Sequence, residues 1–378
     1  MSSLSRKTMV WAAGAALAVG GATAGIVIAA QDSGQPSGHP DAGGAVIARA
    51  AAAKPPLRLV SISPAGGDRD VNGAGNITVT YNQPLPAAAP LPTLSPAIAG
   101  SWQRTGDAVV FTPATGYPAS TRVTVTVNGV AESTNRSASS SSFTTGAYST
   151  LRLQEILAQL GYLPLTWTPY LGTTEPGGSA AAQLSAAYAA PGGTFQWQPG
   201  YPSQLKSFWS EGQTNTLDQG AIAGFEADHG LTVDGTAGAA VWRALVAAAA
   251  ADQQNTHGYS YAMVSENEPE TLTIWHDGRK VFSSLANTGI SVAPTATGTF
   301  YVYEKLTFQI MQGTNPDGSH YADPVSWVSY FNGGDAVHYF PRGSFGWPQS
   351  LGCVELPYDA AKQAYPYLPY GTLVTVNA

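Results

Sequence analysis

Apolar and polar residues alternate with a period of two in three short runs, at residues 76–81, 108–111 and 122–127. Turn-forming sequences rich in Pro, Gly, Thr and Asn separate these runs, at residues 64–67, 112–116 and 128–129. Alternation broken by turns at such short intervals is typical of antiparallel strands packed on one apolar face. The pattern therefore predicts a small β-sandwich over residues 57–146.

The apolar spacing changes to that of helices between residues 148 and 250. A first run has apolar residues at helical intervals: Leu151, Leu153, Ile156, Leu157 and Leu160. A second run covers residues 221–228, and a third contains Val241, Trp242 and Leu245. These runs predict a small α-helical domain over residues 148–250.

A long insert, residues 165–215, separates the first helical run from the second. Its sequence reads as a loop, and a loop of this length is unusual in a compact module. The insert contains five large aromatic residues: Trp167, Tyr170, Trp197, Tyr201 and Trp209. Two interpretations stay open for these aromatic side chains. They are either exposed, where they would stack on sugar rings, or buried against a neighbouring domain.

Strand-like runs return in the last third of the chain, at residues 271–275, 280–282, 298–303 and 371–376. We expect a mostly-β domain over residues 257–378. The segment between residues 303 and 323 is rich in turn residues and reads as a mobile flap.

The N-terminus has the order of a targeting segment. Arg6 and Lys7 precede an uncharged stretch of Ala, Gly and Val that ends at Ala30. Residues 1–30 are therefore expected to be a signal peptide or an N-terminal anchor in the cytoplasmic membrane. Either places the rest of the chain outside the cytoplasm, secreted or membrane-anchored on the cell-wall side. Residues 31–56, rich in Pro, Gly, Ser and Ala, are expected to be a flexible linker.

Composition narrows the possible functions. The formal net charge is −7, and no basic run longer than Arg6-Lys7 is present, which argues against nucleic acid as a partner. The chain has one cysteine, so an intrachain disulfide and a multi-cysteine zinc site are excluded. The six histidines are scattered without a pair at ligand spacing. We expect neither a metal site nor a cofactor.

The single cysteine, Cys353, is the main candidate for chemistry. A lone cysteine in an exported protein is an inert buried residue, half of an intermolecular disulfide, or a reactive thiol. Gly352 frees the backbone before it, so that amides can approach a substrate oxygen. His338, fifteen residues earlier, is a group that can take the thiol proton. These features alone do not decide whether the Cys353 thiol is reactive or inert.

Residues 259–378 resemble the L,D-transpeptidase catalytic domain. The resemblance rests on short motifs: Thr288-Gly289, residues 294–300, Trp327 and Tyr330 before His338, Ser350-x-Gly352-Cys353-Val354-x-Leu356, Asp359-Ala360, and residues 371–374. It implies that His338 is the base and Cys353 the nucleophile. The backbone carbonyl of Tyr339 would orient the histidine.

The same resemblance implies the parts of the reaction. Main-chain amides near Gly352 and Cys353 would hold the oxyanion, and Ser350 would fix the loop. The implied substrate is the stem peptide of peptidoglycan, and the implied product is a 3→3 cross-link formed through a thioester. The segment at 303–323 would cover the cleft. Arg342 is either a contact for a substrate carboxylate or a solvated surface residue.

This sequence departs from the family pattern at two candidate substrate-binding positions. Leu351 stands where the family usually has His, and Glu355 stands where it usually has Arg or Asn. A carboxylate at 355 that points inward would disfavour the thiolate. These departures leave a catalytically degenerate peptidoglycan-binding protein as one alternative. An L,D-carboxypeptidase and an enzyme that anchors proteins to the wall are two others, in which the same chemistry uses water or a protein amine as the acceptor.

Two further resemblances complete the predicted multidomain chain. Residues 57–146 resemble bacterial immunoglobulin-like modules, through Ser63-Pro64, residues 100–102, residues 111–113 and residues 143–145. Residues 148–250 resemble the three-helix peptidoglycan-binding module, most specifically in the Val233-Asp234-Gly235 turn before a Trp-containing helix. The first implies a rigid spacer, and the second implies contact with the glycan.

Overall fold

The computed structural model describes residues 55–128 and 140–378. The predicted signal or anchor at 1–30, and the linker up to residue 54, lie outside the described residues. No helix in the described part of the chain combines the length and apolar character that crossing a membrane requires.

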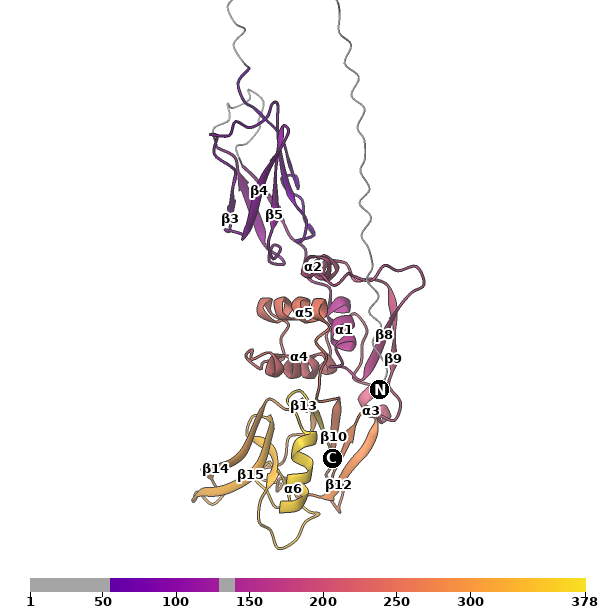
Figure 1. Cartoon of the computed structure of the whole chain (residues 1–378). Coiled ribbons are helices and arrows are strands. Elements are labelled where there is room, and N and C mark those ends of the chain that lie inside the picture. The colour runs from indigo at the N-terminus through magenta and orange to yellow at the C-terminus, as the bar shows by residue number, and fades with distance from the viewer. Residues whose placement is uncertain (1–54, 129–139) are drawn as a thin grey trace, which may run out of the picture. The chain divides into compact units, whose positions relative to one another are not determined.

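Residues 59–126 and 140–144 contain the strands of the predicted β-sandwich (Figure 1). Its strands are β1 (Leu59–Ser63), β2 (Ile77–Tyr81), β3 (Thr93–Ser95), β4 (Gly100–Thr105), β5 (Ala108–Pro113), β6 (Arg122–Thr126) and β7 (Ser140–Thr144). One sheet has the order β1-β2-β5-β4 and the other β3-β6-β7. Alternate residues of both sheets, among them Val79, Phe111 and Val125, are buried in one shared core. The period of two in the sequence therefore corresponds to the buried face of each strand.

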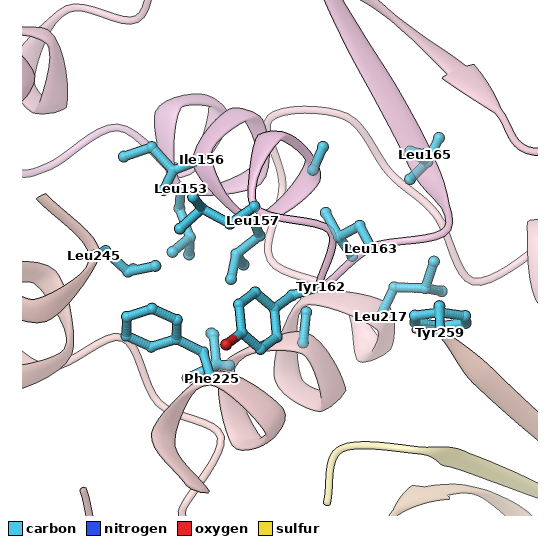
Figure 2. Packing of buried hydrophobic residues seen from close by; sticks show 14 of the residues in the cluster. Leu153, Ile156, Leu157, Tyr162, Leu163, Leu165, Leu217, Phe225, Leu245 and Tyr259 are labelled. Carbon is cyan, nitrogen blue, oxygen red and sulfur yellow. The ribbon is translucent and has the colours of Figure 1, made fainter. Parts of the chain in front are cut away.

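The region from 148 to 251 contains three main helices: α1 (Thr150–Gln159), α4 (Thr216–Asp228) and α5 (Ala239–Ala251). The Ser149 hydroxyl caps α1, and Asn215 with Asp218 forms a capping box at the start of α4. Figure 2 shows Leu153 and Leu157 of α1 directed toward Phe225 of α4.

The insert is a folded part of this region and not the loop predicted from its sequence. It contains β8 (Leu165–Pro169), α2 (Ala180–Tyr188), β9 (Gly193–Trp197) and α3 (Ser203–Lys206), with β8 and β9 paired antiparallel. Trp167 and Tyr201 are buried in the same core as the helices. Among the five aromatic residues that the sequence analysis named in the insert, Tyr170 is exposed, with 57 % of its surface accessible. The aromatic residues of the insert mainly serve packing.

The C-terminal part is built from two sheets. The five-stranded sheet has the order β12-β11-β10-β18-β13, and the four-stranded sheet the order β14-β15-β16-β17. The strands are β10 (Ser260–Ser265), β11 (Thr271–His276), β12 (Arg279–Leu285), β13 (Gly298–Tyr301), β14 (Glu304–Thr314), β15 (His320–Asn332), β16 (Asp335–Tyr339), β17 (Val354–Leu356) and β18 (Leu373–Asn377). Helix α6 (Tyr358–Ala364) continues into a 3-10 turn, Tyr365–Tyr367.

Residues of both sheets share one apolar core, to which Val264, Val337 and Val374 contribute. The segment predicted as a flap, 303–323, is part of an antiparallel hairpin made of β14 and β15. Because the long pairing of these strands satisfies their backbone groups, the segment is regular structure and not a loop.

The helical region and the C-terminal part are packed without an intervening linker. Tyr259, Tyr261 and Leu373 belong to the same buried cluster as α1, α4 and α5, and Figure 2 shows Tyr259 near Leu217. At one point the two backbones touch: a side chain on Gly371 would lie 2.2 Å from the Gly220 carbonyl oxygen. Glycine at 371 is therefore required by this contact and by its φ of +80°.

Candidate active site

Strands β16 and β17 position the candidate nucleophile and base. They pair in parallel, with Val337 opposite Val354 and His338 opposite Glu355. Val337 and Val354 face the core between the two sheets. Successive side chains of a strand point to opposite faces, so His338, Glu355 and the residue before β17, Cys353, face the other side.

That other side opens into a cavity of about 510 Å³. Its lining comes from β16, β17, the hairpin β14–β15 and the turn before Cys353. The residues nearest the candidate chemistry are Tyr330, Asp335, His338, Arg342, Cys353 and Glu355. The structure therefore brings Cys353 and His338 to one cavity, although fifteen residues separate them in the sequence.

His338 is almost completely buried, with 2 % of its surface exposed. Its Nδ1 lies 3.0 Å from the carbonyl oxygen of Tyr339. A carbonyl can only accept, so this contact assigns the proton to Nδ1 and leaves the lone pair on Nε2. Burial lowers the pKa of His338, and the Tyr339 carbonyl and the Glu355 carboxylate partly oppose that effect. The residue is a neutral imidazole at neutral pH, the form that accepts a proton.

Cys353 is a neutral thiol in the resting protein. Burial raises the pKa of Cys353 to about 12, and the carboxylates of Asp335 and Glu355 act in the same direction. The main-chain amide of Ala336 opposes them. The Cys353 Sγ lies 3.6 Å from the carbonyl oxygen of Gly334. With the thiol and the imidazole both neutral, no ion pair is preformed, and the thiol proton has to be removed during attack on a substrate.

A compact turn formed by residues 350–353 holds the thiol. The buried Ser350 hydroxyl donates to the Cys353 carbonyl oxygen at 2.6 Å and accepts from the Gly352 amide at 3.2 Å. Gly352 has a φ of +117°, a conformation that favours glycine. A side chain there would also lie 2.6 Å from Asp335 Oδ1. The Gly352 amide, predicted as an oxyanion donor, is thus already bonded within the turn.

Arg342 and Glu355 form an ion pair at the cavity wall. Arg342 Nε donates to Glu355 Oε2 and Nη2 donates to Oε1, both at 2.7 Å. Nη2 also donates to the Gln349 carbonyl oxygen, and the guanidinium lies over the ring of Phe340. Glu355 raises the pKa of Arg342. Arg342 is therefore neither a solvated surface residue nor a free cation, and Glu355 points inward but is neutralised.

Leu351, the other departure from the family pattern, lies at the rim of the cavity with 37 % of its surface exposed. Asp335 was not among the residues predicted from sequence, although it lies three residues before the candidate base and lines the same cavity. Its signal is weak: an aspartate directly after Gly333-Gly334 is more often a turn residue. Nowhere in residues 55–128 and 140–378 do three His, Cys, Asp or Glu side chains gather as metal ligands.

Comparison with known proteins identifies two domains. Residues 259–376 match the L,D-transpeptidase catalytic domain, and residues 53–145 match the bacterial Ig-like domain. The chain therefore carries an L,D-transpeptidase catalytic domain, from a family of transferase or peptidase-like enzymes that act on peptidoglycan. This confirms two of the three predicted domain types. Neither match covers the helical region, so its identity as a peptidoglycan-binding module stays a prediction.

Several solved structures are similar to the chain. An L,D-transpeptidase from Mycobacterium smegmatis is 17 % identical, with 86 % of this chain and 100 % of that chain covered and a TM-score of 0.30. L,D-transpeptidase 3 from Mycobacterium tuberculosis, with a faropenem-derived adduct, is 16 % identical, with 85 % and 98 % covered and a TM-score of 0.30. The catalytic domain of an E. faecium L,D-transpeptidase is 26 % identical over 31 % of this chain and 96 % of its own, with a TM-score of 0.29. No curated protein matches the chain.

Proposed function

We propose that this protein is a peptidoglycan L,D-transpeptidase that forms 3→3 cross-links by cysteine acyl transfer. The observation that carries the proposal is the cavity that Cys353, directly before β17, shares with His338 of the neighbouring strand β16, with His338 Nδ1 bonded to the Tyr339 carbonyl. That bond leaves Nε2 as the proton acceptor, which a partly buried neutral thiol needs.

In the first step, the Cys353 sulfur attacks the carbonyl carbon that follows the diamino acid at position three of a stem tetrapeptide. The thiol proton passes to His338 Nε2 as the carbon–sulfur bond forms. The Cys353 amide is the candidate oxyanion donor, because the Gly352 amide is bonded to Ser350. The terminal D-alanine leaves with the proton from His338, and a thioester remains.

In the second step, the side-chain amine of a neighbouring stem attacks the thioester carbonyl. The carbon–sulfur bond breaks, the new amide is the 3→3 cross-link, and the proton returns to the Cys353 sulfur through His338. Ser350 supports both steps indirectly, since its hydroxyl holds the Cys353 carbonyl at 2.6 Å.

The remaining parts of the chain fit an enzyme of the cell wall. We propose that residues 1–30 direct export or anchor the chain in the cytoplasmic membrane, that the Ig-like domain is a spacer, and that the helical region at 148–250 binds peptidoglycan. The partners are then stem peptides, glycan and the membrane, and the location is the wall side of that membrane.

A second candidate function is wall binding without catalysis. One observation favours it: burial and two nearby carboxylates raise the pKa of the Cys353 thiol to about 12. The two functions differ in whether the thiol can be acylated.

The test is acylation of the purified protein by a carbapenem at neutral pH, followed by intact-mass and peptide mapping. We expect one adduct, on Cys353, and none in Cys353→Ala. A strain lacking the gene should lose 3→3 muropeptide dimers, and complementation with Cys353→Ala should not restore them. An unmodified thiol would contradict the proposed function and favour the binder. An adduct with altered tetrapeptide-to-tripeptide ratios but unchanged dimers would indicate a carboxypeptidase.

A further inference from the structure

Asp335, the first residue of β16, lines the cavity together with Cys353 and residues of the β14–β15 hairpin. Its Oδ2 accepts from the Ala296 amide and from Asn332 Nδ2, both at 3.3 Å. Its Oδ1 has no hydrogen-bond partner within the described residues and lies against Gly352, the residue before the thiol. One carboxylate oxygen is therefore held, and the other is directed at the turn that carries Cys353.

The charges of the cavity are not balanced. Of its acidic residues, Glu355 is neutralised by Arg342. Asp335 and Asp323 form no ion pair within the part of the chain that the structure describes, and both line the cavity. Negative charge beside the thiol disfavours both a thiolate and an oxyanion. A cation bound there would remove that penalty.

The second step of the proposed reaction brings a cation to this place. The side-chain amine of a diamino acid is an ammonium ion at neutral pH, since its pKa is about 10.4. It must lose one proton before its nitrogen can attack. The Oδ1 of Asp335, beside Cys353, is suitably located to bind the ammonium ion and to accept that proton.

We propose that Asp335 is the acceptor-binding residue, which selects an amine over water as the group that resolves the thioester; this inference rests on the proposed function. The ammonium transfers one proton to Asp335 Oδ1 and becomes a neutral amine. Its nitrogen then attacks the thioester carbonyl carbon, and the carbon–sulfur bond breaks. The second nitrogen-bound proton passes through His338 to the Cys353 sulfur, and Asp335 later releases its proton to water.

Two further observations agree with this role. Burial raises the pKa of Asp335, which brings it closer to the pKa of the amine and makes the proton transfer less unfavourable. The carboxylate is also fixed in orientation by the Ala296 amide, so that little side-chain freedom is lost when an ammonium binds.

The experiment separates acylation from transfer. Wild type, Asp335→Asn and the matched control Asp107→Asn, an exposed aspartate in the turn between β4 and β5, are each acylated by a stem tetrapeptide. The thioester is then divided between water and one of two added acceptors. One acceptor is a stem peptide with a free side-chain ammonium, and the other is hydroxylamine, which is uncharged at neutral pH.

For Asp335→Asn we expect faster acylation, by about three- to tenfold, because a negative charge beside the thiol is removed. The ratio of ammonium-acceptor product to hydrolysis product should fall at least about tenfold, while the hydroxylamine ratio stays within about twofold. Asp107→Asn should match the wild type in all three measurements.

Three outcomes would overturn the inference. An unchanged amine-to-water ratio in Asp335→Asn removes the acceptor role and leaves the proposed function intact. An equal fall with both acceptors indicates a structural effect on the turn. Wild type that forms no thioester at all overturns the proposed function, and this inference with it. If Asp335→Asn unfolds at a lower temperature than the wild type, Asp335→Ser is measured in the same way, and the same ratios decide.

Discussion

Two arginine–glutamate ion pairs in this chain lie in different surroundings, one in a packed core and one at a cavity, and their pKa values are shifted differently. Arg152 and Glu155, on helix α1, are both 0 % exposed and lie 2.9 Å apart. Arg342 and Glu355, at the cavity wall, are 28 % and 6 % exposed and share two contacts of 2.7 Å. The first pair is enclosed in a packed core, and the second borders a cavity.

The pKa shifts of the two pairs run in opposite directions. Burial raises the pKa of Glu155 to about 7 and lowers that of Arg152, so desolvation outweighs their attraction. Glu355, in contrast, raises the pKa of Arg342. Arg152 Nε and Glu155 Oε1 also have no hydrogen-bond partner among the described residues. A buried pair that is incompletely bonded contributes little stability, but it is costly to break.

The largest effect should follow from breaking the enclosed pair. Arg152→Met leaves the Glu155 carboxylate buried without its cation, and removes the donor that bonds Gln183 Oε1 at 2.6 Å. We expect a loss of about 3–5 kcal/mol in the free energy of unfolding at neutral pH, measured by urea denaturation. Arg342→Met is the matched control and should lose about 1 kcal/mol or less. Equal losses in the two variants would contradict the contrast between core and cavity.

A somewhat smaller effect should appear as a pH dependence in the same helical core. Burial raises the pKa of Asp218 from 3.8 to about 7. Because the folded pKa lies above the unfolded one, the contribution of Asp218 to stability is greatest below about pH 4 and is lost as the pH rises toward and through 7. Asp218→Asn does not titrate. Its free energy of unfolding relative to the wild type should therefore increase by about 2–4 kcal/mol between pH 4 and pH 8.

Thermal and urea unfolding at both pH values measure this difference, and the exposed Asp252→Asn variant is the control. A pH-independent difference between Asp218→Asn and the wild type would show that Asp218 stays ionised in its buried position. The carboxylate would then be stabilised by its bonds to Gln154 Nε2 and the Asn215 amide.

Much of the site could be predicted from sequence because its strongest signals are local. The Ser350-x-Gly352-Cys353 motif folds into one turn, and each of its residues has a role there that follows from its type. Once β16 and β17 form, the pleat of each strand determines which of their side chains share a face. The sandwich strands were recognisable for the same reason.

The rest depends on pairing across distance, which no local pattern encodes. Arg342 meets Glu355 because β16 and β17 are parallel neighbours, and the sequence alone left Arg342 without a partner. The segment 303–323 was predicted as a flap without its strands, since its turn residues are conspicuous and the register of the paired strands β14 and β15 is not. The insert was misread for a related reason: the short β8 and β9 become recognisable only when they pair.

A moderate effect on activity should follow from breaking the pair at the cavity. Arg342→Met leaves Glu355 negative beside His338 and near the thiol, where its charge raises the pKa of Cys353. We expect carbapenem acylation of Cys353 to slow about tenfold, which corresponds to about 1.4 kcal/mol. Replacing both partners, as Arg342→Met with Glu355→Met, should recover part of that rate.

Stopped-flow or mass-spectrometric acylation rates provide the measurement, and Arg279→Met, an exposed arginine on β12, is the matched control. If the double variant were slower than Arg342→Met alone, the carboxylate of Glu355 would have a direct role in acylation. Its charge would then be required and not merely tolerated.

The smallest effect should come from the departure at residue 351. Leu351 lies at the rim of the cavity, 37 % exposed, whereas the neutral imidazole of His338 is buried and already oriented by the Tyr339 carbonyl. Leu351→His adds a polar ring that solvent can reach, so it should not compete with His338 for the thiol proton. We expect a change of less than about threefold in the acylation rate and about 0.5 kcal/mol or less in stability. A rate increase of tenfold or more would mean that the rim, and not the buried imidazole, limits how readily the thiol reacts.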